Sequence, residues 1–173
     1  MAITKEELLS RQLHVGVDYD RRTVFIFGEI NQDSSYKAIV ALQALDRDDG
    51  EIRIILNSDG GGEADGYAIY DTILLCRNHI SIDGYGSVMS IAAAILQAGD
   101  ERRVSPNASF MIHNGSAPGE ETMQQNAIMD LAKQLEKDNQ RYYQILATGS
   151  GQSQKSIEAW CRHETEFLSL IHI

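Results

Sequence analysis

Apolar residues in the first half of the chain follow two spacings that alternate along the sequence. The runs 21–30 and 51–62 are apolar, contain β-branched residues and carry glycine near their ends, which is typical of buried strands. Apolar side chains recur at steps of three or four in 34–50 and 63–79, which predicts helices, and 80–86 predicts a third strand. The alternation of strands and helices predicts an α/β fold.

The second half of the chain has a different pattern. A short helix is predicted at 92–97, and 102–116 predicts two short strands separated by Pro106 and Asn107. A single amphipathic helix is predicted at 120–148, more than twice the average length of about 11–12 residues. We expect part of this helix to project beyond the core and to need a partner, with a coiled-coil seam as the alternative. Its apolar stripe consists of Ile128, Leu131, Leu135, Tyr142 and Ile145.

The composition excludes several classes of function. The chain has 173 residues, enough for one domain, and a formal net charge of -10. Phosphate binding needs clustered Lys and Arg, so neither nucleic acid nor an anionic membrane surface is an expected partner. Cys76 and Cys161 form neither a disulfide framework nor a CxxC pair, which favours a reducing, cytoplasmic setting. No secretory signal, membrane span, metal site or cofactor is predicted.

Ser90 lies in an apolar, small-residue stretch, at the expected start of the helix at 92–97. A serine at this position is usually an N-cap that accepts hydrogen bonds from backbone N–H groups. It can also be a nucleophile, because oriented amides at a helix start stabilise developing negative charge. This stretch alone leaves both interpretations open.

Two further features belong to the same predicted edge of the sheet. The glycine cluster at 57–66 follows a strand and opens a helix, so its backbone can approach a ligand closely. His113 ends an apolar strand and enters a polar loop. A serine, a histidine and free backbone amides supply the nucleophile, general base and oxyanion donors that acyl transfer requires. The cluster lacks the dinucleotide and phosphate-loop patterns, and Ser90 lacks the GxSxG pattern of α/β-hydrolases.

Three stretches in register carry a family resemblance. The stretches resemble ClpP, the proteolytic subunit of the Clp protease, and they read NSDGGGEADGYAIYDTI, GYGSVMSIAAAILQAG and SPNASFMIHNG. In the same order, ClpP has a glycine pair before a helix, IYDTM, ASMGAFLL and PNSRVMIHQ. The agreement runs from about Arg22 to Ile157, with a small deletion near 100–104. The resemblance implies a ClpP/crotonase-like fold of repeated ββα units in one domain. Its head would comprise about 20–118 and 150–167, and a long handle helix would span about 119–149.

The resemblance also implies roles for individual residues. Ser90 matches the nucleophile and His113 the general base, while the backbone N–H groups of Gly61 and Ile91 match the oxyanion hole. The handle helix matches the one through which two heptameric rings dock into a tetradecamer. Asp59 stands where the family usually has proline, which leaves the glycine pair in place.

The third catalytic position departs from the family, which has an aspartate shortly before an aromatic residue. Alignment on Phe167 without a gap places Thr165 there, and a slip of one residue places Glu164 or Glu166 there. A glutamate can orient an imidazole as an aspartate does, so Glu164 is the predicted third residue. An ordinary surface acid is the alternative.

Both ends of the chain differ from the family. The final residues, 168–173, resemble translated adapter sequence and are expected to be a non-native tail. The N-terminal region does not match the axial loops through which the family meets a AAA+ unfoldase. This divergence resembles ClpP-like proteins of phages, which process capsid proteins.

The sequence therefore predicts an ATP-dependent, Clp-type serine endopeptidase. It would hydrolyse unfolded proteins inside a homo-oligomeric barrel, through an acyl-enzyme on Ser90. Three alternatives remain: an inactive, ClpR-like structural subunit, a phage capsid-processing protease, and a crotonase-type acyl-CoA enzyme.

Overall fold

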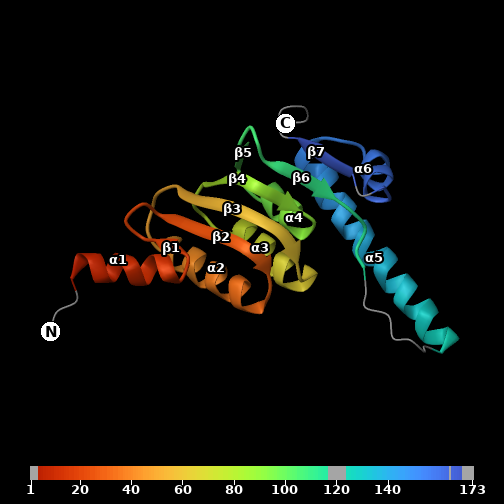
Figure 1. The fold of residues 1–173 in the computed structure, drawn as a ribbon, viewed down its shortest axis with the longest axis horizontal. Coiled ribbons are helices and arrows are strands. Elements are labelled where there is room, and N and C mark those ends of the chain that lie inside the picture. The colour runs from red at the N-terminus through yellow and green to blue at the C-terminus, as the bar shows by residue number, and fades with distance from the viewer. Residues whose placement is uncertain (1–3, 117–123, 164, 169–173) are drawn as a thin grey trace. The chain divides into compact units, whose positions relative to one another are not determined.

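The computed structural model describes residues 4–116, 124–163 and 165–168. The chain forms two compact units (Figure 1). The first consists of the described residues up to Met111 together with Glu166–Leu168, and the second spans Ile112–Thr165. The sequence prediction that the chain is a single domain stays a prediction.

The first unit is built on a mixed sheet whose centre is parallel. Strand β2 pairs with β3, and β3 with β4, in parallel, while β1 pairs antiparallel with β2. The strand order is β1-β2-β3-β4-β6-β7, with β5 beside β4. The strands are β1 (Val17–Asp18), β2 (Thr23–Ile30), β3 (Ile52–Gly61), β4 (Ile80–Met89), β5 (Glu101–Val104), β6 (Ser109–Ile112) and β7 (Thr165–Leu168).

Helices cover one face of this sheet and create its core. Ile52, Ile54 and Leu56 of β3 are fully buried, whereas Arg53 between them is exposed. This alternation is expected when one face of a strand packs on helices and the other does not. The helices are α1 (Lys5–His14), α2 (Gln32–Leu45), α3 (Glu63–Leu75) and α4 (Ile91–Gln97), of which α2, α3 and α4 pack on the central strands (Figure 1).

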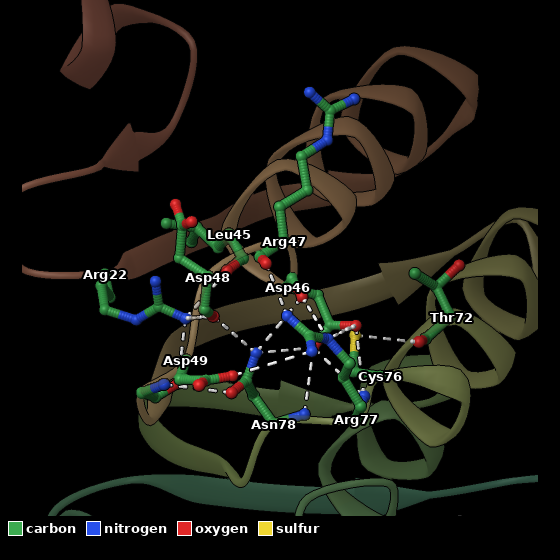
Figure 2. Close-up of polar contacts among 11 residues, drawn as sticks. Arg22, Leu45, Asp46, Arg47, Asp48, Asp49, Thr72, Cys76, Arg77 and Asn78 are labelled. Atoms are coloured by element: carbon green, nitrogen blue, oxygen red, sulfur yellow. Dashed lines mark hydrogen bonds and ion pairs between the residues drawn. The ribbon is translucent and has the colours of Figure 1, made fainter.

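Asp46 joins the ends of α2 and α3 (Figure 2). Its carboxylate accepts hydrogen bonds from the backbone N–H groups of Arg77 and Asn78, at 3.1 and 3.0 Å, and from the Asn78 amide at 2.8 Å. Desolvation, the largest effect, raises the pKa of Asp46, but these hydrogen bonds and the charge of Arg77 together lower it below its ordinary value. Helix α2 therefore ends at Leu45, before the predicted stop at Gly50.

The Arg22 guanidinium holds the loop that follows Asp46 (Figure 2). It donates to the carbonyls of Leu45, Asp48 and Gly50 at 2.8, 3.1 and 2.9 Å. These bonds satisfy backbone oxygens that a longer helix would have paired internally. The predicted helix is thus correct in type, and its end was placed five residues too late.

Strand β4 changes partner halfway along, and this brings its end to the candidate site. Ser81–Gly84 pairs with β5, and Ser87–Met89 pairs with β6. Between these parts the register against β3 shifts, and the Asn57 side chain accepts a hydrogen bond from the Ser87 N–H at 3.0 Å. The shift lets the last residues of β4 run beside β6 directly before Ser90.

The second unit contains two helices, α5 (Gln125–Ser150) and α6 (Gln154–Cys161). Helix α5 ends at Gly151, which has a left-handed backbone that terminates helices. Tyr142, Tyr143 and Leu146 are buried near its end, whereas Ile128 near its start is 53 % exposed. The predicted long helix is confirmed where the structure describes it. Residues 117–123, which include the predicted start of the helix, lie outside the described residues.

Helix α1 has no counterpart in the sequence prediction. Thr4 and Glu7 bond reciprocally, since the Thr4 N–H donates to the Glu7 carboxylate and the Glu7 N–H to the Thr4 hydroxyl. This capping box is a signal in the sequence that could have predicted the helix. Within the described residues no helix is long and apolar enough to cross a membrane.

Candidate active site

Ser90 occupies a strained backbone turn between β4 and α4. Its φ and ψ are 54° and -129°, a combination that a residue with a side chain rarely adopts. Such strain costs on the order of 1–3 kcal/mol and persists only where the surroundings impose it. Ser90 stands at the N-cap position of α4 but makes no side-chain cap hydrogen bond, so the N-cap interpretation is wrong.

The backbone on both sides of Ser90 is fixed by hydrogen bonds. Its N–H donates to the Met111 carbonyl at 2.9 Å, which continues the pairing of β4 with β6. Its carbonyl accepts from the Ala93 N–H at 2.9 Å, which begins the first turn of α4. The strand and the helix together impose the turn and present the serine between them.

The glycine cluster lies directly against the Ser90 side chain. A Cβ atom added at Gly60 would lie 2.6 Å from the Ser90 Cβ, closer than real Cβ atoms approach, and 3.2 Å from the Ser90 Oγ. Gly60 also has a φ of +102°, which side chains disfavour. The close approach expected between the glycine loop and the serine is therefore present.

The amides of the glycine loop differ in their partners. The Gly60 N–H donates to the buried Ser58 hydroxyl at 3.0 Å, and the Gly62 N–H donates to the Ile30 carbonyl at 2.7 Å. Gly61 lies between them with a φ of +146°, and a Cβ atom there would lie 2.2 Å from the Ile30 carbonyl oxygen. The loop is pinned on both sides of Gly61, whose N–H stays the predicted oxyanion donor.

Ile91, the other predicted oxyanion donor, is the first residue of α4. The first N–H groups of a helix lack acceptors within that helix. The Ile91 side chain is 2 % exposed, and a Cβ atom added at Gly66 of α3 would lie 2.2 Å from its Cγ1. Only glycine lets α3 approach this closely, and the contact fixes the start of α4.

His113 belongs to the second unit and is half-buried. Its Nδ1 lies 2.7 Å from the carbonyl oxygen of Asn114. A carbonyl oxygen only accepts hydrogen bonds, so Nδ1 must carry the proton in this contact. In the neutral ring Nε2 is then the basic nitrogen. The pairing of His113 with Ser90 stays a prediction from the sequence.

The third catalytic position is described only in part. Glu164 lies outside the described residues. Thr165, which aligns there without a gap, donates its hydroxyl to the Trp160 carbonyl at 2.8 Å. The predicted role of Glu164 therefore stays a prediction.

The two cysteines are poor nucleophiles. Burial, followed by the charge of Asp46, raises the pKa of Cys76 to about 11. Burial raises the pKa of Cys161 to about 12. A thiol reacts as its thiolate, so neither side chain is activated near neutral pH. Over the described ranges, no group of three His, Cys, Asp or Glu side chains could hold a metal ion.

Comparisons with known proteins agree with this fold. The family model described as Clp protease matches residues 10–169. An ATP-dependent Clp protease proteolytic subunit of Ligilactobacillus salivarius is 35% identical over 142 residues, covering 79% of this chain and 70% of the relative. The ATP-dependent Clp protease proteolytic subunit 3 of Rhizobium johnstonii is 34% identical over 158 residues, covering 90% of this chain and 80% of the relative.

A solved structure is similar as well. A mutant of ClpP1 from Listeria monocytogenes superposes with a TM-score of 0.78 at 29% identity, covering 86% of this chain and 84% of the other. The predicted ClpP-like α/β fold is thus confirmed. The chain belongs to the Clp protease family.

Proposed function

We propose that this chain is a serine endopeptidase subunit that cleaves peptide bonds of unfolded proteins through an acyl-enzyme on Ser90. The observation that carries the proposal is the strained turn of Ser90 against Gly60, in a chain of the Clp protease family. Strained residues cluster at sites where the strain has a function.

The chemistry requires one base and two oxyanion donors. His113 takes the proton of the Ser90 hydroxyl on Nε2 as Oγ attacks the carbonyl carbon of the substrate. The N–H groups of Gly61 and Ile91 donate to the oxyanion that forms. The C–N bond then breaks, and the leaving amine takes the proton from His113. Water, deprotonated by His113, hydrolyses the ester and restores Ser90.

Assembly is the second part of the proposal. The relatives are named proteolytic subunits of an ATP-dependent protease, and we infer homo-oligomeric rings paired with a AAA+ unfoldase. The start of α5 supports this, because Ile128 and Met129 are 53 % and 51 % exposed on a long helix. Exposed apolar side chains on a helix are commonly covered by a partner.

Hydrolysis of a fluorogenic peptide tests the activity. Ser90→Ala and His113→Ala are each expected to lose roughly 10³-fold or more, because these residues act as a unit. Native mass spectrometry of each variant shows whether its assembly is unchanged. Full activity in Ser90→Ala would contradict the proposal.

A second candidate is an inactive structural subunit. It is favoured by the absence of an aspartate at the third position, where the Thr165 hydroxyl is bonded to the Trp160 carbonyl. This candidate predicts an assembled chain that cleaves nothing, whereas the protease predicts cleavage that depends on Ser90.

A further inference from the structure

We propose that the backbone carbonyl of Asn114, held in position by the Tyr143 hydroxyl, orients His113 in this chain. The inference rests on the proposed function, in which His113 is the base. It makes Asn114 and Tyr143 positioning residues and removes the need for a carboxylate at the third catalytic position.

The orientation of His113 depends on the contact that its Nδ1 makes. In a serine protease triad, the carboxylate accepts a hydrogen bond from Nδ1–H, which fixes the tautomer and the ring orientation and stabilises the imidazolium. The Asn114 carbonyl, 2.7 Å from the His113 Nδ1, accepts the same proton. A neutral carbonyl fixes the tautomer as well as a carboxylate does, but it stabilises the cation less.

The Asn114 peptide is itself held from several sides. Its N–H donates to the Cys161 carbonyl at the end of α6, at 3.2 Å. Its side-chain oxygen accepts from the Tyr143 hydroxyl at 2.6 Å. The next N–H, that of Gly115, donates to the Asn139 side chain at 2.8 Å. The carbonyl cannot turn away from His113 without straining these bonds.

Helix α5 supplies both side-chain partners of this loop. Asn139 and Tyr143 are four residues apart and therefore lie on one face of the helix. They are 9 % and 3 % exposed, so water competes little for their hydrogen bonds. Burial, followed by the nearby Cys161, Glu158 and Glu136, raises the pKa of Tyr143, and Arg162 opposes this. The hydroxyl therefore stays a donor near neutral pH.

Thr165, which aligns with the family's aspartate, differs from Asn114 in the partner that its side chain has. The Thr165 hydroxyl donates its proton to the Trp160 carbonyl. The Asn114 carbonyl, in contrast, adjoins His113 in the chain and meets its Nδ1. A positioned backbone oxygen explains how a chain without the family's aspartate can retain a usable base.

The first test compares rates at Ser90. Tyr143→Phe removes only the hydroxyl, so labelling of Ser90 by a fluorophosphonate is expected to slow by about tenfold, the worth of one buried hydrogen bond. The midpoint of its pH–rate profile is expected to move to lower pH, because the protonated ring loses stabilisation. Tyr36→Phe is the matched control, because this tyrosine of α2 is 67 % exposed, and it is expected to change neither the rate nor the profile.

A double variant separates positioning from a general loss of stability. Tyr143→Phe and Asn114→Ala break the same bond, so the combined variant is expected to label no more slowly than the slower single variant. Thermal unfolding and native mass spectrometry of all three variants check that each is folded and assembled. Full additivity, or a large loss in Glu164→Gln with none in Tyr143→Phe, would overturn the proposal.

Nitrogen-15 NMR of histidine-labelled protein reads the tautomer without any activity. The signal of His113, identified by its loss in His113→Gln, is expected to show the Nδ1–H tautomer in the wild type and a mixture in Tyr143→Phe. An Nε2–H tautomer in the wild type would overturn the proposal. An Nδ1–H tautomer in a protein whose Ser90 never labels would instead contradict the proposed function and leave the orientation of His113 intact.

Discussion

Ser90 and His113 are held in place by different kinds of interaction. Ser90 sits in a strained turn, with a strand before it, a helix after it and the Gly60 backbone against its side chain. His113 is held through Asn114, whose position depends on hydrogen bonds from side chains of α5 and from α6. The energy of a steric clash rises steeply over a few tenths of an ångström, as the tight contacts at Gly60 imply, whereas a hydrogen bond weakens gradually as its distance and angle change. Substitutions around Ser90 should therefore slow the labelling of Ser90 more than substitutions around His113 do.

The largest effect is expected at Gly60. In Gly60→Ala the new methyl group collides with the Ser90 Cβ, so fluorophosphonate labelling of Ser90 should fall by about 100-fold, as misplacement by an ångström can cause. Gly28→Ala is the matched control, because Gly28 also has a positive φ of +76° but nothing within 4 Å of an added Cβ. Equal losses of labelling in the two variants would show that backbone strain alone, and not the contact with Ser90, matters.

A smaller effect is expected at Gly66. In Gly66→Ala the new methyl group meets Ile91 in the buried contact between α3 and α4. Overpacking outweighs the better helix propensity of alanine, so urea unfolding should show a loss of about 1 to 2 kcal/mol. At Gly62 the corresponding contact is the end of the Asp65 side chain, which can move. If Gly62→Ala destabilised the chain as much, the α3–α4 contact would not be the cause.

The smallest effect is expected at Asp46, which is far in sequence from both proposed catalytic residues, Ser90 and His113. The folded state lowers the pKa of Asp46, so its ionised form stabilises the fold. That stabilisation is complete above the unfolded pKa of about 3.9 and is lost as the pH falls through the folded value. Wild type and Asp46→Asn should therefore differ in unfolding free energy at pH 7 and converge below about pH 4.

The labelling of Ser90 serves as the control for Asp46. The network around Asp46 joins helix ends, so Asp46→Asn should label at the wild-type rate at pH 7. A stability difference that persists in acid, or a loss of labelling, would contradict the assignment of Asp46 to stability alone.

The periodicity of the sequence was sufficient for most of the fold. The strands β2, β3 and β4 and the helices α2 to α5 occur where apolar spacing predicts them. The prediction placed the end of α2 too late because the Asp46 network, which involves Arg77 and Asn78 from far along the chain, stops the helix. Long-range hydrogen bonds of this kind leave no periodic signal.

The sequence predicted some residues of the candidate site and missed others. Ser90 and the glycine loop carry motifs in the sequence, and the structure shows the loop against the serine. The role of Asn114 was missed, because it acts through its backbone carbonyl, which every residue has. Tyr143 was missed because a buried tyrosine on the apolar face of a long helix has the pattern of an ordinary core residue.

Mass-spectrometric mapping of a fluorophosphonate adduct shows whether Ser90 is an activated nucleophile. The assembled wild-type chain is treated with the reagent and digested, and the modified peptide is identified beside a Ser90→Ala control. We expect one adduct, on Ser90, that is absent from the control. A folded and assembled chain that carries no adduct at Ser90 would contradict it.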